Sequence, residues 1–394
     1  MTAPASPATI ILRKNEDRRI LSGHPWVFSN EIRETSGKPT TGAVVEVRNA
    51  GGKPLGIGFY HAQSLIAVRL LSRTPVDVDA DFFCARLQGA HALRARLFPG
   101  STVYRLVHGE ADFLPGLIID RFNDLFVVQA LSFGMDAHLP MICDVLEDLI
   151  HPAAIIERND PPLRTLDGLP LKKGLLRGST STVTFSDGHL QFTVDLLAGQ
   201  KTGSFLDQRT NRLAIRQFST GARVLDCFCN DGGFGLHAAQ AGAASVTGID
   251  SSGEAIARAR INASQNGIST ASFEEADVFA SLAARAERGE IYDVVVLDPP
   301  SFTKNRKTVP AAKKGYRELH QLAFRVLAPG GYLLSASCSH HILPETFLDV
   351  IRDATQRSER RIQLLEWHGA SPDHPTLPAV PETGYLKFGV FRVL

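Results

Sequence analysis

Residues 224–235 read Val-Leu-Asp-Cys-Phe-Cys-Asn-Asp-Gly-Gly-Phe-Gly, and this stretch decides the fold class. An apolar pair ends in a carboxylate, small residues and glycines follow, and the run after residue 235 is compatible with a helix. The pattern therefore predicts a strand, a tight turn and a helix. Glycines allow a sharp turn and a close approach to a ligand, and the start of a helix offers free N–H groups. In an α/β sheet such a turn is typical of a site for a nucleotide-like ligand.

Strand-like and helix-like runs alternate from residue 221 onward. The strand runs are 224–226, 245–250, 271–274 and 292–297, and the helix runs between them are 236–241, 254–265 and 278–288. A β-α-β-α-β series with apolar strands predicts a parallel, doubly wound sheet that carries helices on both faces.

Two further acids lie where the next strands end. Asp250 ends the second strand, where a carboxylate suits the hydroxyls of a ribose, and Asp277 follows the third, where it can accept a hydrogen bond from an adenine amino group. Either acid could instead cap the helix that follows it. The glycine-rich turn and these two acids, each at the end of a strand, together favour a bound ligand. A dinucleotide or S-adenosylmethionine fits them equally well.

Residues 294–302 read Val-Val-Val-Leu-Asp-Pro-Pro-Ser-Phe, a buried strand that runs into an acid and two prolines. Proline presets the backbone, so the strand ends in a rigid turn. The motif resembles the Asp/Asn-Pro-Pro motif of class I methyltransferases, which favours S-adenosylmethionine as the ligand. The sheet order of that class places the fourth and fifth strands side by side. The fifth strand here is 331–339, so Cys338 is expected to lie beside Asp298.

Cys338 and Asp298 suit one particular reaction. Cytosine C5 is a poor nucleophile, so its methylation requires a thiolate to add first at C6. An acid near N3 and the exocyclic amine stabilises that adduct, and a base later removes the C5 proton. Cys338 would be the nucleophile and Asp298 the acid that positions the base. Taken in isolation, an apolar cysteine at a strand end more often serves packing.

A basic cluster follows the proposed catalytic acid. Between residues 301 and 317 no acid occurs, and Phe302 opens the segment. The candidate RNA contacts are Phe302, Lys304, Arg306, Lys307, Lys313 and Lys314. The whole chain has a formal net charge of only +1, so a surface for nucleic acid has to be a local patch of this kind. A solvated loop is the alternative.

Length and composition set the remaining bounds. A chain of 394 residues is expected to form two or three domains. Residues 1–7 are polar and proline-interrupted, no run reaches a membrane-spanning length, and a cytoplasmic protein is expected. The five scattered cysteines predict reduced thiols, and the absence of zinc-type spacing makes a metal site a poor expectation.

Residues 23–28, Gly-His-Pro-Trp-Val-Phe, belong to a β-rich module that ends near residue 75. Together with the hairpin that follows and the run 66–71, this phrase resembles a PUA domain, which implies contact with RNA. A small barrel that only packs on its neighbour is the alternative. The next region has mixed α and β patterns, and its Asp160-Pro161-Pro162 is expected to be a loop because no buried strand precedes it. The predicted domains are 1–75, 76–190 and 191–394.

Motifs along nearly the whole chain together resemble the bacterial large-subunit ribosomal RNA cytosine-5 methyltransferases that carry a PUA domain. They are 23–28, 201–209, 225–234, 297–302, 337–340, and the terminal 373–375 and 385–387. The resemblance implies a Rossmann-like class I methyltransferase domain after a small β-barrel-like PUA domain and an α+β middle domain. The residues assigned to S-adenosylmethionine are Thr202, Phe205, Gln208, Arg209, Asp226, Asp231, Gly232, Gly233, Asp250, Asp277 and Asp298.

Two departures from relatives stand out. Residues 227–231 read Cys-Phe-Cys-Asn-Asp, where many relatives carry an aromatic residue and Thr, and the Asp-Pro-Pro motif lacks the Pro-Cys of other RNA cytosine-5 enzymes. One cysteine, Cys338, would then have to suffice.

The predicted function is methylation of a cytosine C5 in 23S ribosomal RNA, with no membrane association and with a homodimer left open. The rival functions are methylation of an exocyclic base amine, which needs no thiol, and an RNA-binding assembly factor that retains the cofactor without using it.

Overall fold

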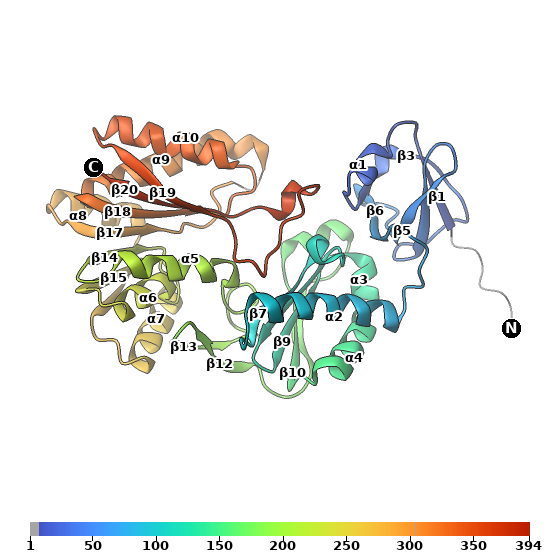
Figure 1. Ribbon diagram of the computed structural model, residues 1–394, viewed down its shortest axis with the longest axis horizontal. Helices are drawn as coiled ribbons and strands as arrows, with labels where there is room; N and C mark the ends of the chain where they lie inside the picture. Colours follow the sequence, from blue (N-terminus) through green and yellow to red (C-terminus); the bar gives the residue numbers. More distant parts are fainter. Residues whose placement is uncertain (1–7, 304) are drawn as a thin grey trace. The chain divides into compact units, whose positions relative to one another are not determined.

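The computed structural model describes residues 8–303 and 305–394 (Figure 1). The chain forms two compact units. Among the described residues the first unit holds 8–185, 194–206 and 372–384, and the second holds 186–193, 207–371 and 385–394. No helix in these described ranges is long and apolar enough to cross a membrane.

The first unit opens with a six-stranded sheet in the order β2-β6-β5-β4-β1-β3. Its strands are β1 (Ala8–Leu12), β2 (Trp26–Phe28), β3 (Ile32–Thr35), β4 (Val44–Arg48), β5 (Pro54–Tyr60) and β6 (Ile66–Ser72). Val45 and Val47 of β4 alternate with more exposed neighbours and join Ile10, Val68 and Leu70 in the core. Because successive side chains of a strand point to opposite faces, one face of β4 packs into the core and the other is more exposed.

A five-stranded sheet in the order β11-β10-β9-β8-β7 follows in the same unit. Its strands are β7 (Val103–His108), β8 (Leu117–Phe122), β9 (Leu125–Ala130), β10 (Ala154–Asn159) and β11 (Lys172–Arg177), and its helices are α2 (Ala80–Leu97), α3 (Phe133–Ala137) and α4 (Leu139–Ile150). Helices α3 and α4 follow one another as two separate helices, because Pro140 lacks the N–H that a continuous helix needs and lies in the first turn of α4. Asp160-Pro161-Pro162 leads into a 3₁₀ turn, so the loop prediction is confirmed, but the reason given for it was wrong, because the buried strand β10 directly precedes it.

The second unit is built on a seven-stranded sheet in the order β16-β15-β14-β17-β18-β20-β19. Its strands are β14 (Arg223–Cys227), β15 (Ser245–Asp250), β16 (Ala271–Glu275), β17 (Tyr292–Leu297), β18 (Leu327–Ser337), β19 (Ile362–His368) and β20 (Lys387–Val393). The first five are parallel to one another, whereas β20 runs antiparallel to both β18 and β19. The doubly wound, parallel-rich sheet of a class I methyltransferase is therefore confirmed.

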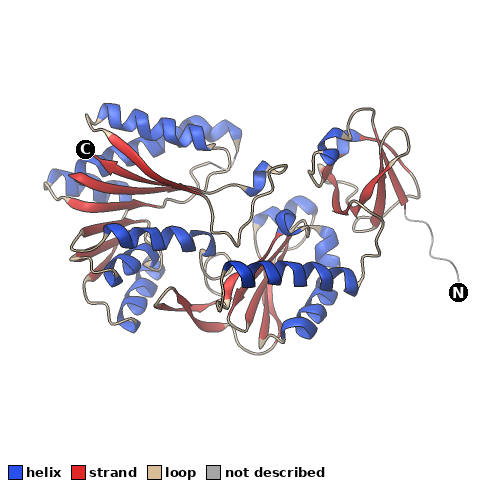
Figure 2. Ribbon diagram, in the orientation of Figure 1, coloured by secondary structure: helices blue, strands red, loops and turns tan. Residues whose placement is uncertain are grey.

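Helices cover both faces of this sheet (Figure 2). They are α5 (Arg209–Ala214), α6 (Gly233–Gln240), α7 (Gly253–Gln265), α8 (Val278–Glu287), α9 (Val309–Val326) and α10 (Pro344–Arg357). Val295 and Leu297 of β17 pack with α8, α9 and α10, while Val294 and Val296 pack on the side of α6. A strand that is buried on both faces explains the unbroken apolar run before Asp298.

Candidate active site

The candidate site lies where parallel strands of the second unit end. Strand β14 carries Asp226 as its last residue but one, β15 ends at Asp250, and β17 and β18 end one residue before Asp298 and Cys338. Carboxyl ends of parallel strands meet at one edge of a sheet, which is where α/β proteins bind ligands. The structure thus places these four side chains at a common edge.

Asp226 is a fully buried acid beneath the glycine-rich turn. Its Oδ2 accepts a hydrogen bond of 2.8 Å from the N–H of Gly235, and its Oδ1 has no hydrogen-bond partner among the described residues. Burial raises the pKa of Asp226 to about 8, and the nearby charges of Asp298, Asp250 and Asp231 add to this shift. This edge of the sheet is therefore rich in acids, an arrangement that favours a ligand with a positively charged group.

The turn between β14 and α6 is shaped for close approach. Phe228 and Asn230 adopt positive φ angles of 62° and 48°, and Gly232 adopts 87°. A Cβ on Gly232 would lie 3.1 Å from the ring of Phe273, so both conformation and space favour glycine there. The N–H of Asn230 donates to Oδ2 of Asp250 at 3.0 Å, which ties the turn to the end of β15.

Arg212 packs against this turn at Gly233, a role that the sequence did not reveal. Its guanidinium pairs with Asp187 at 2.7 Å, and a Cβ on Gly233 would lie 2.7 Å from its Cδ. Burial raises the pKa of Asp231, and the charge of Arg212 opposes that shift. Arg209, predicted at the cofactor, lies 3.8 Å from Asp187 and so contributes to the same cluster.

Cys338 lies beside the turn that Asp298 begins. The Sγ of Cys338 lies 4.0 Å from the carbonyl oxygen of Pro299, the residue after Asp298. Gln208 donates from Nε2 to Oδ1 of Asp298 at 2.9 Å and accepts from Nδ2 of Asn211 at 2.7 Å. Gln208, predicted as a cofactor ligand, thereby fixes the orientation of the Asp298 carboxylate.

A hydroxyl network holds the end of β18. The OH of Tyr316 on α9 donates to Oγ of Ser337 at 2.9 Å and lies 3.0 Å from Oγ of Ser339. Burial raises the pKa of Tyr316 to about 12, so its proton stays in place at neutral pH. The half-buried ring of Phe302, predicted to contact RNA, packs against Tyr316 at 4.5 Å between centroids. Residues 337 and 339 therefore flank Cys338 with fixed positions.

The other predicted residues have these surroundings. Asp277 caps α8 by accepting from the N–H of Ala280 at 2.9 Å, and its exposed side chain remains accessible. Thr202 and Phe205 belong to the first unit, where Thr202 donates to Oδ2 of Asp120 at 2.5 Å. The basic residues Arg306, Lys307, Lys313 and Lys314 make no ion pair with any described residue, and Lys304 lies outside the described residues.

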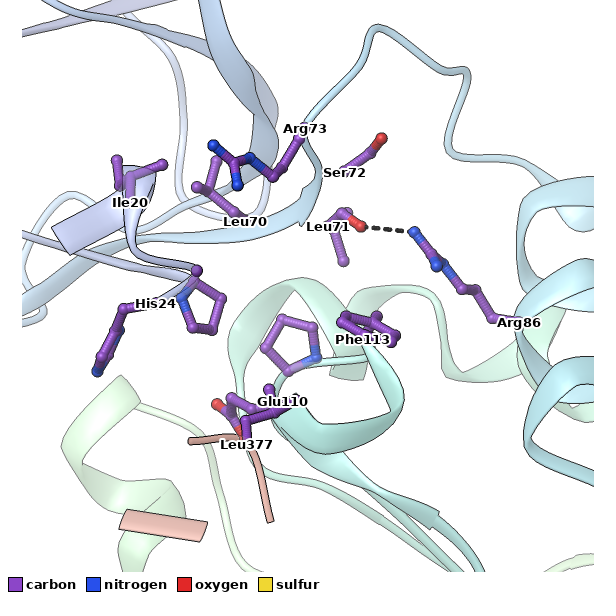
Figure 3. Close-up of a pocket in the computed structure, with 13 residues that line it drawn as sticks. Ile20, His24, Leu70, Leu71, Ser72, Arg73, Arg86, Glu110, Phe113 and Leu377 are labelled. Carbon is purple, nitrogen blue, oxygen red and sulfur yellow. Dashed lines mark hydrogen bonds between the residues drawn. The ribbon is translucent and has the colours of Figure 1, made fainter. Parts of the chain in front are cut away.

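The first unit contains a cavity of about 360 Å³, drawn in Figure 3. Phe113 and Glu110 face Leu70 and Leu71 across it. Phe113 is 54% exposed. Its φ is 58°, a backbone conformation that a bulky residue rarely adopts. Arg86 donates to the carbonyl of Leu71 at 3.0 Å and lies over the Phe113 ring at 5.5 Å. The cavity thus combines an apolar wall, an exposed aromatic ring and a cation.

Asp226 makes stability depend on pH in a direction that can be tested. Folded Asp226 keeps its proton up to about pH 8, whereas an unfolded Asp loses it near about pH 4. The stability that this bound proton contributes is complete below about pH 4 and is lost as the pH rises towards 8. Asp226→Asn keeps an acceptor for Gly235 and cannot ionise, so its stability relative to wild type should rise with pH, by at most about 1.4 kcal/mol per unit.

Thermal or urea unfolding of both proteins between about pH 5 and pH 8 measures this difference. Glu254→Gln, at an exposed position on α7, is the matched control and should show no such trend. A difference between Asp226→Asn and wild type that stays constant with pH would contradict the raised pKa.

Comparison with known proteins gives consistent matches. A family model described as a PUA-like domain matches residues 10–73, and one described as an S-adenosylmethionine-dependent methyltransferase matches residues 175–392. A protein of Aeromonas hydrophila named ribosomal RNA large subunit methyltransferase I is 40% identical over 98% of this chain and 99% of its own. The protein of the same name from Photobacterium profundum is 39% identical over 96% and 98%.

Two solved structures share the fold. A protein of Streptococcus mutans whose description is a SAM-dependent methyltransferase has a TM-score of 0.83, with 18% identity over 98% of this chain and 99% of that one. A second, described as a methyltransferase complexed with SAH, has a TM-score of 0.84, with 19% identity over the same shares.

Proposed function

The chain belongs to the family of S-adenosylmethionine-dependent ribosomal RNA large-subunit methyltransferases with a PUA-like domain, and on that premise we propose that it methylates C5 of a cytosine in 23S ribosomal RNA. The observation that carries the cytosine-5 assignment is the position of Cys338, whose Sγ lies 4.0 Å from the Pro299 carbonyl at the turn that Asp298 begins. A cytoplasmic location and a homodimer stay predictions.

Cys338 and Asp298 divide the chemistry between them. The thiolate of Cys338 forms a bond to C6 of the cytosine, and the electron pair of the C5–C6 double bond is released toward C5 and N3. Asp298, held by Gln208, is assigned to N3 and the exocyclic amine, where it acts as an acid: the proton that it donates to N3 neutralises the negative charge pushed onto the ring and returns to Asp298 when the C5–C6 double bond forms again. After C5 has gained its methyl group, a base removes the C5 proton and the bond from sulfur to C6 breaks.

The residues at the strand ends fit the cofactor. S-adenosylmethionine supplies an activated methyl group on a positively charged sulfur. Oδ1 of Asp226 and Oδ1 of Asn230 are buried without a hydrogen-bond partner among the described residues, and they lie at an acidic edge. We assign Asp231, Gly232 and Gly233 to the methionine moiety, Asp250 to the ribose and Asp277 to the adenine. The assignment of Thr202 and Phe205 rests on the resemblance alone.

Transfer of a labelled methyl group from S-adenosylmethionine to ribosomal RNA, followed by mass-spectrometric mapping of the modified nucleotide, tests the proposal. A 5-methylcytosine in the large-subunit RNA is the expected product. A methyl group on an exocyclic amine would instead support the rival reaction. Cofactor binding without transfer to any ribosomal RNA fraction would support an assembly factor.

RNA contacts are proposed separately for each unit. In the second unit, Arg306, Lys307, Lys313 and Lys314 surround the start of α9, and their charges suit phosphates. In the first unit, the cavity suits an unstacked base that packs on Phe113, with a phosphate at the exposed Arg73, which makes no hydrogen bond or ion pair with a described residue. A charged rim beside an exposed aromatic ring is typical of single-stranded RNA sites.

Phe113→Ala is expected to weaken RNA binding while leaving cofactor binding unchanged. Alanine keeps the same backbone strain, so the change isolates the ring, whose loss should reduce affinity by about 1–3 kcal/mol if one base stacks there. Filter binding or fluorescence titration with a large-subunit RNA fragment measures it. Arg73→Ala should weaken binding less and lower its salt dependence, whereas Arg96→Ala, at an exposed position on α2, is the matched control. If Phe113→Ala binds RNA as tightly as wild type does, the proposal that an RNA base binds in this cavity is wrong.

A further inference from the structure

Lys387 is a buried cation on the strand next to the one that leads to Cys338. Only 3% of the residue is exposed. It opens β20, where it pairs in register with Ser337, the last residue of β18. The antiparallel pairing of β18 and β20 therefore brings the ammonium to the edge of the sheet where Cys338 begins the following loop.

The hydrogen bonds of Lys387 leave its charge without a counterion. Its Nζ donates to the carbonyl oxygens of Ser339 at 2.8 Å and Tyr385 at 2.7 Å. One of these bonds therefore holds Ser339, the residue that directly follows Cys338. No carboxylate among the described residues forms an ion pair with Lys387, and two carbonyls leave one of its three N–H groups over. Burying a charge without a partner of opposite sign costs free energy, so an anion near this ammonium would stabilise the folded protein.

Other ionisable groups near the end of β18 are engaged elsewhere. Asp298 receives the Gln208 amide, and the OH of Tyr316 lies between Ser337 and Ser339. The OH of Tyr385 donates to Asp207 at 2.5 Å, and its ring packs against His340 at 5.4 Å.

The position of the ammonium points to the Cys338 sulfur as its anion, because Nζ of Lys387 is bound to the carbonyl of Ser339, the next residue in the chain. Burial lowers the pKa of Lys387 to about 8, and the charge of Cys338 acts in the opposite direction, so the two groups feel each other. The interaction is reciprocal: a thiolate that favours the ammonium is favoured by it to the same extent.

We propose that Lys387 is a positioning residue that holds the Cys338 sulfur as a thiolate before the substrate arrives. This inference rests on the proposed function, in which Cys338 is the nucleophile. The two carbonyl bonds fix the ammonium in place, so its charge does not have to reorganise when the thiolate attacks. The proton that leaves the thiol goes to solvent, and Lys387 remains protonated throughout. No general base is then needed to activate the thiol.

The test is the pH profile of alkylation of Cys338 by iodoacetamide, followed by peptide mass spectrometry on the full chain without substrate. In wild type the alkylation rate should reach half of its maximum well below about pH 8.5, the ordinary midpoint of a cysteine. Lys387→Met has nearly the same shape without the charge, and its midpoint should rise by at least about one pH unit, so that the rate at neutral pH falls about tenfold. Lys387→Arg keeps the charge and should keep a lowered midpoint.

Cys84 supplies the internal control in every sample, because it is partly exposed and belongs to the other compact unit. Its profile should not change in any variant. The proposal is overturned if Lys387→Met and wild type share one midpoint, or if wild-type Cys338 already titrates as an ordinary thiol. The second outcome decides the matter even where Lys387→Met does not fold. Alkylation needs no methyl transfer, so failure of the cytosine-5 assignment would appear separately, as full turnover by a protein that lacks Cys338.

Discussion

Replacing Cys338 with Ala is expected to abolish methyl transfer to cytosine C5, with a loss on the order of 10⁴-fold or more, the scale typical of removing a catalytic nucleophile. The side chain lies one residue beyond the end of β18, and Ser337 and Ser339 on either side are held by Tyr316. Loss of one sulfur should therefore leave the surrounding structure intact. Turnover of labelled cofactor with ribosomal RNA, together with a thermal unfolding curve, measures both properties.

Two controls make the result specific. Cys84→Ala removes a partly exposed thiol from the first unit and should leave turnover unchanged. RNA in which the target cytosine carries fluorine at C5 should trap wild type as a covalent adduct, because fluorine cannot leave as a proton does, and Cys338→Ala should form none. Full turnover by Cys338→Ala would end the cytosine-5 proposal and favour methylation of an exocyclic amine.

The edge of the sheet where Cys338 and Asp298 meet could be predicted because it follows from chain order. Alternating strands and helices with apolar strands dictate parallel pairing, and the strand order typical of class I methyltransferases places β17 beside β18. Once those strands are neighbours, residues just past their carboxyl ends must meet. The 4.0 Å separation of Cys338 Sγ and the Pro299 carbonyl is the outcome of that rule.

The supporting residues could not be predicted, because their partners are distant in sequence and carry no local signal. Asp187 sits in a Ser-Asp-Gly-His turn, where an Asp is an ordinary turn residue, yet it forms the buried partner of Arg212. Tyr316 occupies an apolar position of an amphipathic helix and gives no hint of its bonds to Ser337 and Ser339. Lys387 gives no signal in the sequence, because its position near Cys338 depends on the register of β20 with β18.

Asp298→Asn is expected to lower turnover by about 10²–10⁴-fold, the range typical of a group that handles a proton or a developing charge. Asparagine keeps an oxygen that can accept from Nε2 of Gln208, so the orientation of residue 298 should survive and only the charge is lost. Asp293→Asn, at an exposed position on the same strand, is the matched control and should remain active. Steady-state turnover and the affinity for S-adenosylmethionine are the two measurements.

The pair of substitutions at residues 298 and 338 separates the reactions that the site could perform. A carboxylate beside the target amine is needed for either methylation at C5 or methylation of the exocyclic amine, so Asp298→Asn should slow both. A thiolate is needed only for C5, so Cys338→Ala should stop that reaction alone. In Asp298→Asn the thiol should still react with iodoacetamide, because Lys387 and its two carbonyl bonds are untouched. Full activity of Asp298→Asn would transfer the role of stabilising the base to another group at the site, with His340 the first to test because it stands two residues beyond Cys338 and packs on Tyr385.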